Sequence, residues 1–207
     1  MTTIELAVEQ RNFLRDVDWQ TYLALSDTTD RAGCRLTYDQ GDLEIMTPSM
    51  PHERYGTMIG RMVERYSEIF DIEIRSVAST TFRRADMHRG FEADEAYYVQ
   101  NAERIRGISQ VELEIHPPPD LVVEIEISRS AIDKMSLFAA MGIPELWRYN
   151  RESLEVYCLK NQTYASAATS EVFPGFPLKY AEHLLGLQLT SNETTLIRQF
   201  ARHCESL

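Results

Sequence analysis

The order of the helical and strand patterns predicts a mixed α/β fold, a central sheet flanked by helices in a single domain. A helix, several strands, a second helix and further strands follow one another, and neither a linker nor a repeat interrupts them. The chain has 207 residues, of which 43% are hydrophobic, so it can bury one core. We therefore expect one domain over residues 18–207, after an N-terminal tail at 1–17.

The N-terminal part of the domain is expected to hold a short helix, a hairpin and a long helix. The short helix covers residues 19–25, and strands at 35–38 and 43–46 flank a turn in which Gly41 supplies a positive φ. Ser49 and Pro51 mark the start of the long helix. Its apolar residues recur at helical spacing and form a stripe for burial: Tyr55, Met58, Ile59, Met62, Val63 and Tyr66.

The remaining elements alternate strands with two more helices. Strands are expected at 72–77, 79–83, 92–99 and 121–127, and then at 145–149, 154–159 and 163–167. A helix at 131–141 ends at Gly142 and Pro144, and an amphipathic helix covers 194–204.

Composition excludes several classes of protein. The N-terminus lacks a signal pattern, and no run of 18 apolar residues exists, so we expect a soluble cytoplasmic protein without a membrane partner. The three cysteines are far apart and read as reduced, small hydrophobic residues. The net charge of −11 argues against broad electrostatic binding to nucleic acid, because phosphate contacts come from Lys and Arg.

One acidic pair stands inside a strand that otherwise reads as buried. Residues 121, 123, 125 and 127 are apolar and share one face, whereas Glu124 and Glu126 share the other. A buried carboxylate costs several kcal/mol unless a cation, a proton or a base accompanies it, and a metal would satisfy both. The alternative is an edge strand whose second face is wet.

Further charged residues can be placed near this strand. Asp94 lies in the strand at 92–99, Glu53 opens the long helix, and Lys134 opens the helix that follows Glu124 by ten residues. Two carboxylates, a third acid from a helix and a lysine are what metal-dependent phosphodiester cleavage needs. Gly56 and Gly60 follow Glu53 along one helical stripe, where close helix packing is the favoured interpretation.

Six segments then carry a family resemblance. They are Gly41-Asp42-Leu43-Glu44-Ile45-Met46-Thr47-Pro48-Ser49, His52-Glu53, Gly90-Phe91-Glu92-Ala93-Asp94-Glu95, the strand at 118–128, Asp133-Lys134 and Gly142-Ile143-Pro144-Glu145-Leu146-Trp147. In this order, over residues 18–180, they resemble the Uma2 family, which is similar to the PD-(D/E)XK nuclease superfamily. The resemblance implies the restriction-endonuclease-like fold and a DNA endonuclease that depends on Mg²⁺ or Mn²⁺.

The resemblance also implies roles for individual residues. Asp94 resembles the aspartate of the PD element, although Ala93 replaces the proline, and Glu124 the acid of the (D/E)XK element. Glu126 stands where the lysine is expected, and Lys134 resembles a lysine that has migrated to the next helix. Glu53 resembles an accessory acid. The implied metal ligands are Asp94, Glu124, Glu53 and the backbone carbonyl of Ile125.

Several residues have two interpretations. The cluster of Arg83, Arg84 and Arg89 is either a phosphate-binding patch or a solvated turn. His52 lies at the edge of the helix stripe and reads as a hydrogen-bonded, partly buried histidine rather than a general base. Glu126 could add a third acid to the cation site.

Two functions from different classes follow. The first is a Mg²⁺- or Mn²⁺-dependent endonuclease whose partner is DNA. The second is a catalytically degenerate nuclease fold that works as a nucleic-acid- or protein-binding module, which the acidic charge and the missing in-strand lysine favour. A glycosidase with Glu124 and Glu126 as its two acids is a poor third, since nothing else indicates a sugar cleft. A homodimer is expected because one small acidic domain offers little surface for a duplex.

Overall fold

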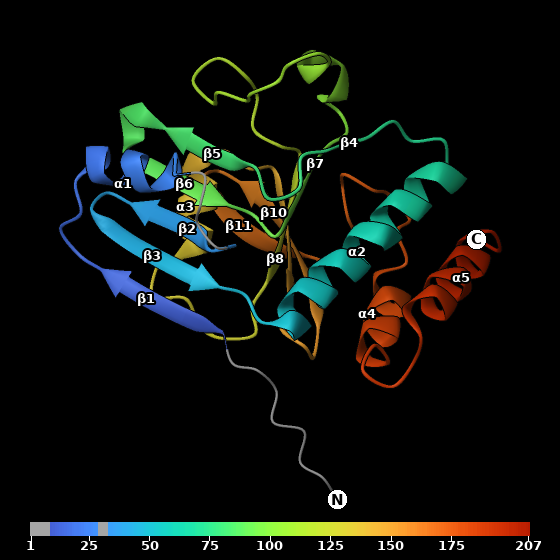
Figure 1. Cartoon of the computed structure of the whole chain (residues 1–207). Helices are drawn as coiled ribbons and strands as arrows, with labels where there is room; N and C mark the ends of the chain where they lie inside the picture. The colour runs from blue at the N-terminus through green and yellow to red at the C-terminus, as the bar shows by residue number, and fades with distance from the viewer. Residues whose placement is uncertain (1–8, 29–32) are drawn as a thin grey trace, which may run out of the picture.

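A computed structural model describes residues 9–28 and 33–207, and its strands form two sheets (Figure 1). The larger sheet has the order β11-β10-β9-β8-β7-β4 and the smaller has the order β1-β3-β2-β6-β5. The strands of the larger sheet are β4 (Arg75–Ser76), β7 (Glu95–Tyr98), β8 (Leu121–Ile125), β9 (Glu145–Tyr149), β10 (Leu154–Lys160) and β11 (Thr163–Ala167). Those of the smaller sheet are β1 (Gln10–Leu14), β2 (Arg35–Asp39), β3 (Asp42–Thr47), β5 (Thr81–Arg84) and β6 (Arg89–Glu92).

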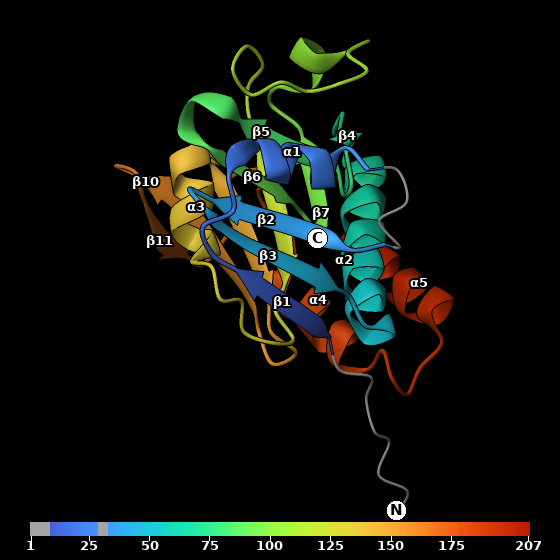
Figure 2. The same cartoon turned by 60° about the vertical axis from the view of Figure 1, so that its left-hand side comes forward.

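Helices and the smaller sheet cover the two faces of the larger sheet. The described α-helices are α1 (Trp19–Ser26), α2 (Met50–Ile69), α3 (Lys134–Met141), α4 (Leu178–Gly186) and α5 (Glu193–Cys204), with short 3-10 helices at Ala85–Met87 and Ala102–Ile105. On one face, α2, α4 and α5 form a core with Val123 and Trp147 (Figure 1). On the other, α3 and the smaller sheet form a second core around Val122, Phe91 and Phe138 (Figure 2). The expected mixed α/β class with helices around a sheet is confirmed.

Strand register decides which charged residues are neighbours. β8 is antiparallel to β7, with Glu95 opposite Val123, and parallel to β9, with Glu124 opposite Arg148. The other strand pairs are antiparallel. Glu124 therefore has Arg148 beside it on the same face of the larger sheet.

The hairpin and the long helix form as their local chemistry predicts. Gln40 and Gly41 have φ values of 50° and 109°, the two positive φ angles of a tight hairpin turn between β2 and β3. Ser49 caps α2 by accepting from the backbone N–H of His52. Asp133 caps α3 in the same way by accepting from the backbone N–H of Ser136.

Three expected elements differ in the structure. Of the strand expected at 92–99, only Glu95–Tyr98 forms a strand of the larger sheet, β7, and the residues just before it form β6 (Arg89–Glu92) in the smaller sheet. The chain leaves the smaller sheet at Ala93 and enters the larger sheet after Asp94. The strand expected at 72–77 is only Arg75–Ser76, the stretch that pairs with β7. The helix expected at 131–141 begins at Lys134, since the Asp133 cap sets its first turn.

Besides the two short 3-10 helices, one further strand and one α-helix were absent from the expectations. The residues placed in an N-terminal tail include β1, which pairs with β3 from Gln10 to Leu14. This strand is mostly polar, and its sequence shows no apolar alternation. Only Arg11 and Phe13 are partly buried. The other is α4, whose buried residues Leu178, Ala181 and Leu184 do follow helical spacing.

Several further residues have structural roles. Trp147 and Tyr149 are buried in the core. The three cysteines, Cys34, Cys158 and Cys204, are free. Asp120 serves a turn, since it accepts from the backbone N–H groups of Val99 and Asn101. In the part of the chain that the structure describes, no helix is long and apolar enough to cross a membrane.

Candidate active site

Asp94 lies where the chain passes from the smaller sheet to the larger one. Its side chain is almost fully buried, and Oδ2 accepts a 2.7 Å hydrogen bond from the backbone N–H of Ile125 in β8. If β7 began before Asp94, this N–H would donate to a backbone carbonyl of that strand. The carboxylate takes that place, which pins Asp94 to the end of β8, one residue from Glu124.

Two cationic side chains contact the other oxygen of Asp94. His52 Nε2 lies 2.7 Å and Arg35 Nε 3.1 Å from Oδ1. Burial opposes ionisation of Asp94, but His52, Lys134 and Arg35 outweigh it and hold the pKa of Asp94 below its ordinary value. Asp94 is therefore an ionised carboxylate at neutral pH.

Buried Glu124 forms an ion pair with Lys134, which is partly buried. Lys134 Nζ, on the first turn of α3, lies 2.5 Å from Glu124 Oε2. Burial raises the pKa of Glu124, although Lys134 acts in the opposite direction. The pKa of Lys134 is raised by Glu124 and Asp94 against the effect of burial. Thus α3 brings an amine to the strand that carries Glu124.

His52 is held between two carboxylates. The ring is fully buried, with Nδ1 2.5 Å from Glu9 Oε1 and Nε2 on Asp94. Burial lowers its pKa, but Asp94 and Glu9 raise it to about 9, so the imidazole is protonated at neutral pH and both nitrogens donate. A histidine in this state orients Asp94 and has no free nitrogen to act as a base.

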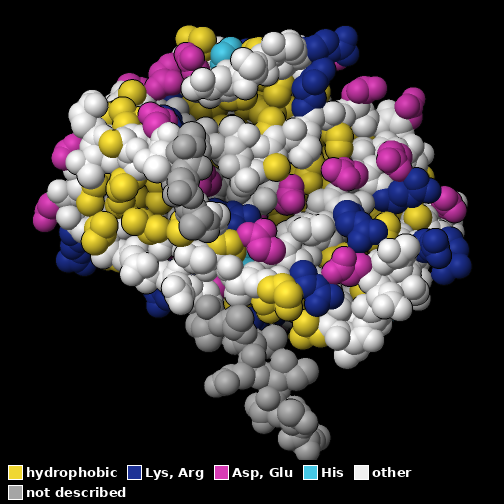
Figure 3. Space-filling view, viewed as in Figure 1, with side chains coloured by type: hydrophobic (Ala, Val, Ile, Leu, Met, Phe, Trp, Pro, Cys, Tyr) yellow, Lys and Arg dark blue, Asp and Glu magenta, His cyan; other side chains and the backbone are white. Residues whose placement is uncertain are grey.

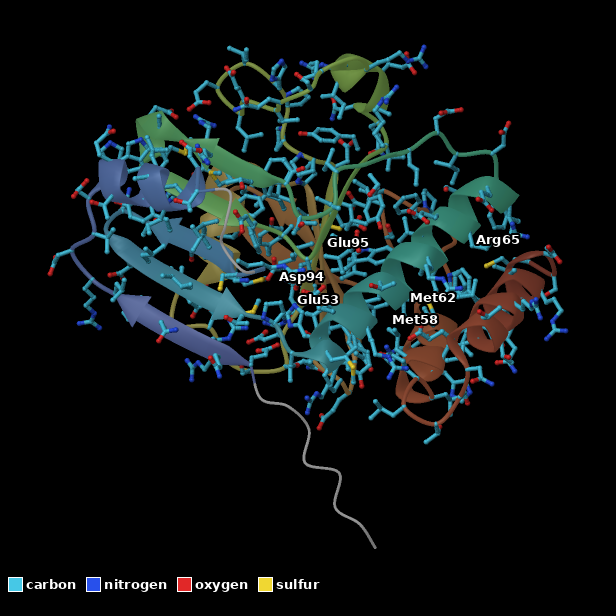
Figure 4. The ribbon with its side chains drawn as sticks, in the orientation of Figure 1. Glu53, Met58, Met62, Arg65, Asp94 and Glu95 are labelled. Carbon is cyan, nitrogen blue, oxygen red and sulfur yellow. The ribbon has the colours of Figure 1, made fainter. Side chains whose placement is uncertain are left out.

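Glu53 lies at the rim of the site. Its carboxylate pairs with Arg35, whose Nη1 lies 2.6 Å from Oε1, and Arg35 also contacts Asp94. In Figure 4, Glu53 and Asp94 are near each other at the N-terminal end of α2. About half of the Glu53 side chain is exposed. Arg35 thus bridges the helical acid and the strand acid.

The two glycines of α2 serve close packing. A Cβ on Gly56 would meet Ile125 and Asp94 at 3.9 and 4.0 Å, and one on Gly60 would meet the Tyr97 hydroxyl at 3.0 Å. The helix therefore passes close to the strands next to the acids, and the interpretation of Gly56 and Gly60 as packing residues is confirmed.

Glu126 projects into a neighbouring pocket and pairs with an arginine. Its Oε2 lies 3.4 Å from Nη1 of Arg148. The pocket has a volume of about 320 Å³ and also borders Glu124, Ile125 and Lys134. Glu126 therefore stands at the position expected for an in-strand lysine, and it pairs with Arg148 of β9.

The three arginines of the expected basic patch are each paired with a carboxylate. Arg83 contacts Asp27 at 2.6 Å, Arg84 contacts Asp86 at 2.7 Å and Arg89 contacts Asp39 at 2.7 Å. On the face shown in Figure 3, basic and acidic side chains are interspersed. These pairs leave less net positive charge for phosphate than the sequence cluster suggested, and the three arginines lie on β5 and β6 of the smaller sheet.

A polar network that the sequence did not reveal supports the site from β1. Arg11 contacts Glu9 at 3.1 Å, Glu44 at 2.5 Å and Ser128 Oγ at 2.8 Å. Glu44 in turn accepts from the backbone N–H of Ala131. The network fastens the loop between β8 and α3, and therefore Lys134, to the smaller sheet. Glu44 was readable as an acid inside an apolar strand, the same signal that identified Glu124.

Glu95 is a further titratable group that the motifs did not single out. It lies on the α2 side of the larger sheet, with Oε2 3.3 Å from the Tyr97 hydroxyl (Figure 4). Burial raises its pKa to about 7, with Glu64 and Asp94 acting in the same direction. The pKa of its neighbour Asp94 is lowered instead, so the two adjacent acids titrate in different pH ranges.

The donor atoms of the site fit a small, hard cation. No group of three or more His, Cys, Asp or Glu side chains in residues 9–28 and 33–207 is arranged to hold a metal ion. However, Oε1 of Glu124 is buried and has no hydrogen-bond partner among the described residues. Mg²⁺ is commonly held by one or two carboxylates and keeps several waters, so it does not require a larger cluster. Asp94 and Glu124 supply such oxygens.

Comparison with known proteins agrees with this architecture. The model of the Uma2 family, described as "Putative restriction endonuclease", matches residues 19–191. A crystal structure titled as a "putative nuclease belonging to DUF820" from Anabaena variabilis superposes with a TM-score of 0.53 at 14% identity, covering 89% of this chain and 99% of that one. At this identity the likeness concerns the fold. No curated protein matches significantly.

Proposed function

Since this chain belongs to the Uma2 family, we propose that it is a divalent-metal-dependent endonuclease that hydrolyses phosphodiester bonds of DNA. The observation that carries the proposal is the convergence of Asp94, Glu124 and Lys134, together with the unpartnered buried oxygen of Glu124. Buried acids beside a partly buried amine are typical of sites that stabilise phosphoryl charge.

Each residue has a proposed role. Asp94, Glu124 and the backbone carbonyl of Ile125 would hold the cation, Mg²⁺ or Mn²⁺, with Glu53 as an accessory ligand. The bound cation would polarise the phosphate and lower the pKa of a coordinated water. Lys134 would donate hydrogen bonds to the phosphate as negative charge grows on its oxygens. His52 and Arg35 keep Asp94 ionised and oriented.

A second candidate is a nuclease fold without activity that binds nucleic acid or protein. Both oxygens of Asp94 already accept hydrogen bonds or ion pairs from His52, Arg35 and Ile125, and Glu126 occupies the lysine position. These contacts favour a site that is satisfied without a metal. The two candidates differ in one respect, which is turnover.

The deciding experiment is a nicking assay. Supercoiled plasmid is incubated with the protein and Mg²⁺ or Mn²⁺, beside Asp94→Asn and Glu124→Gln variants, with EDTA as the metal-free control. We expect the wild type to give nicked and linear DNA and the variants to give none. DNA that stays intact under all metal conditions, with a folded wild type, would favour the binding module. The homodimer, the cytoplasmic location and the use of DNA rather than RNA belong to the same proposal.

A further inference from the structure

The 320 Å³ pocket beside Glu124 has a different charge balance from the rest of the molecule. Four cationic and three acidic side chains line it, whereas the whole chain carries a net charge of −11. The cationic residues are Arg11, Arg129, Lys134 and Arg148. A surplus of cations at one pocket of an acidic protein indicates a site for an anion.

Three of these cations already have carboxylate partners. Arg11 is held by Glu9 and Glu44, Lys134 by Glu124, and Arg148 by Glu126 and Glu155. Arg129 differs from all three, because it is exposed and has no carboxylate partner among the described residues. It lies in the loop between β8 and α3, five residues after Glu124.

Arg148 is placed at the pocket by strand register. It lies opposite Glu124 in the parallel β8–β9 pair, so the two side chains are neighbours on one face of the sheet. Its guanidinium is fixed by Glu126 at 3.4 Å, Glu155 at 2.9 Å and the Tyr157 hydroxyl at 3.1 Å. An arginine held in this way presents a preorganised set of donors. The role of Glu126 is then to position Arg148.

We infer that Arg129 and Arg148 bind a phosphate of the nucleic-acid backbone next to the one at Glu124 and Lys134. The inference rests on the proposed function, which supplies the substrate. It implies that the bound nucleic-acid strand runs from Asp94 and Glu124 toward β9. A guanidinium matches the geometry of a phosphate through paired N–H donors. The two arginines would therefore act in binding the strand, and Asp94, Glu124 and Lys134 in its cleavage.

The test separates binding from cleavage. Binding of a fluorescein-labelled DNA duplex is measured by anisotropy in metal-free buffer over a series of salt concentrations. The variants are Arg129→Gln, Arg148→Gln and Arg148→Lys, and the matched control is Arg202→Gln, an exposed arginine on α5. Thermal unfolding of each variant shows whether it folds. Arg148→Lys retains a positive charge and guards against loss of structure in Arg148→Gln.

We expect Arg129→Gln to weaken DNA binding several-fold and to reduce the slope of log Kd against log salt by about one. Arg148→Gln should weaken binding less than Arg129→Gln does, because Glu126 and Glu155 already offset its charge, and Arg148→Lys should keep most of the slope. In the cleavage assay these variants should raise KM more than they lower kcat. The control Arg202→Gln should leave both measurements unchanged.

Failure of this inference is distinguishable from failure of the proposed function. An Arg129→Gln, Arg148→Gln double variant that binds DNA like Arg202→Gln would overturn the inference, whether or not the protein cleaves. A wild type whose binding depends on the two arginines but that never cuts DNA would support the inference and overturn the endonuclease. A wild type that binds no DNA would overturn both.

Discussion

The amine of Lys134 lies 2.5 Å from Oε2 of Glu124, and this contact joins the first turn of α3 to the buried strand β8. In the proposed site it takes the role of a lysine that would stand two residues after Glu124 on the same strand. Glu124 and Asp94 both raise the pKa of Lys134, so the amine is charged at neutral pH. The contact makes Lys134 the residue on which activity should depend most.

We expect Lys134→Ala to lower metal-dependent cleavage about a hundredfold, on the order of 3 kcal/mol of transition-state stabilisation. Metal affinity should be unchanged or slightly higher, because removal of a cation near the acids relieves its repulsion of the metal. Single-turnover cleavage and calorimetric titration with Mn²⁺ measure the two effects. If Mn²⁺ binding is lost together with cleavage, Lys134 is structural.

Asp94 should be required for metal binding itself. Asp94→Ala removes one proposed ligand and leaves His52 and Arg35 without their shared acceptor, so two positive charges would then repel the cation. Calorimetry should detect a Mn²⁺ site in the wild type and none in this variant. Asp133→Ala, which removes a helix cap next to Lys134, is the control and should keep the site. Equal titration of wild type and Asp94→Ala would exclude Asp94 as a ligand.

The Glu9–His52 contact should stabilise the fold in a pH-dependent way. Burial raises the pKa of Glu9, but His52, Ser128 and Arg11 outweigh it and lower the pKa from 4.5 to about 2. A depressed carboxyl pKa contributes stability that is complete above the unfolded value, near pH 4.5, and is lost as pH falls toward 2.

Glu9→Gln should therefore reduce the free energy of unfolding at pH 7 by on the order of 2 kcal/mol, after allowance for solvent screening. The difference from the wild type should shrink between pH 4.5 and 2. Urea titrations across this range measure it. Glu103→Gln, which breaks only an exposed pair with Arg106, should have no measurable effect. A difference that is constant with pH would show that Glu9 contributes no charge effect.

The patch of Arg83, Arg84 and Arg89 should contribute less to DNA binding than Arg129. Changing Arg84 and Arg89 to Glu should weaken binding and flatten its salt dependence, but only slightly, since Asp86 and Asp39 already offset their charges. Anisotropy at several salt concentrations compares the double variant with Arg129→Gln. If the double variant of the patch loses more DNA affinity than Arg129→Gln does, the DNA strand lies over β5 and β6 instead.

Sequence patterns alone were sufficient for the elements with strong local signals. Alternation of apolar residues predicted β8, helical spacing with Ser49 and Pro51 predicted α2, and an acid inside an apolar strand singled out Glu124. Each of these signals depends on residues close together in the chain, where burial and capping leave a direct imprint on composition.

Only the tertiary structure showed which of these residues meet. Glu9 lies 43 positions from His52 and Glu44 lies 33 from Arg11, and the polar strand β1 that carries or adjoins two of them has no recognisable pattern. The break at Asp94 likewise arises because its carboxylate bonds to Ile125, 31 residues away. Contacts between distant charged groups are selected by packing and strand register, and neither leaves a periodic trace along the chain.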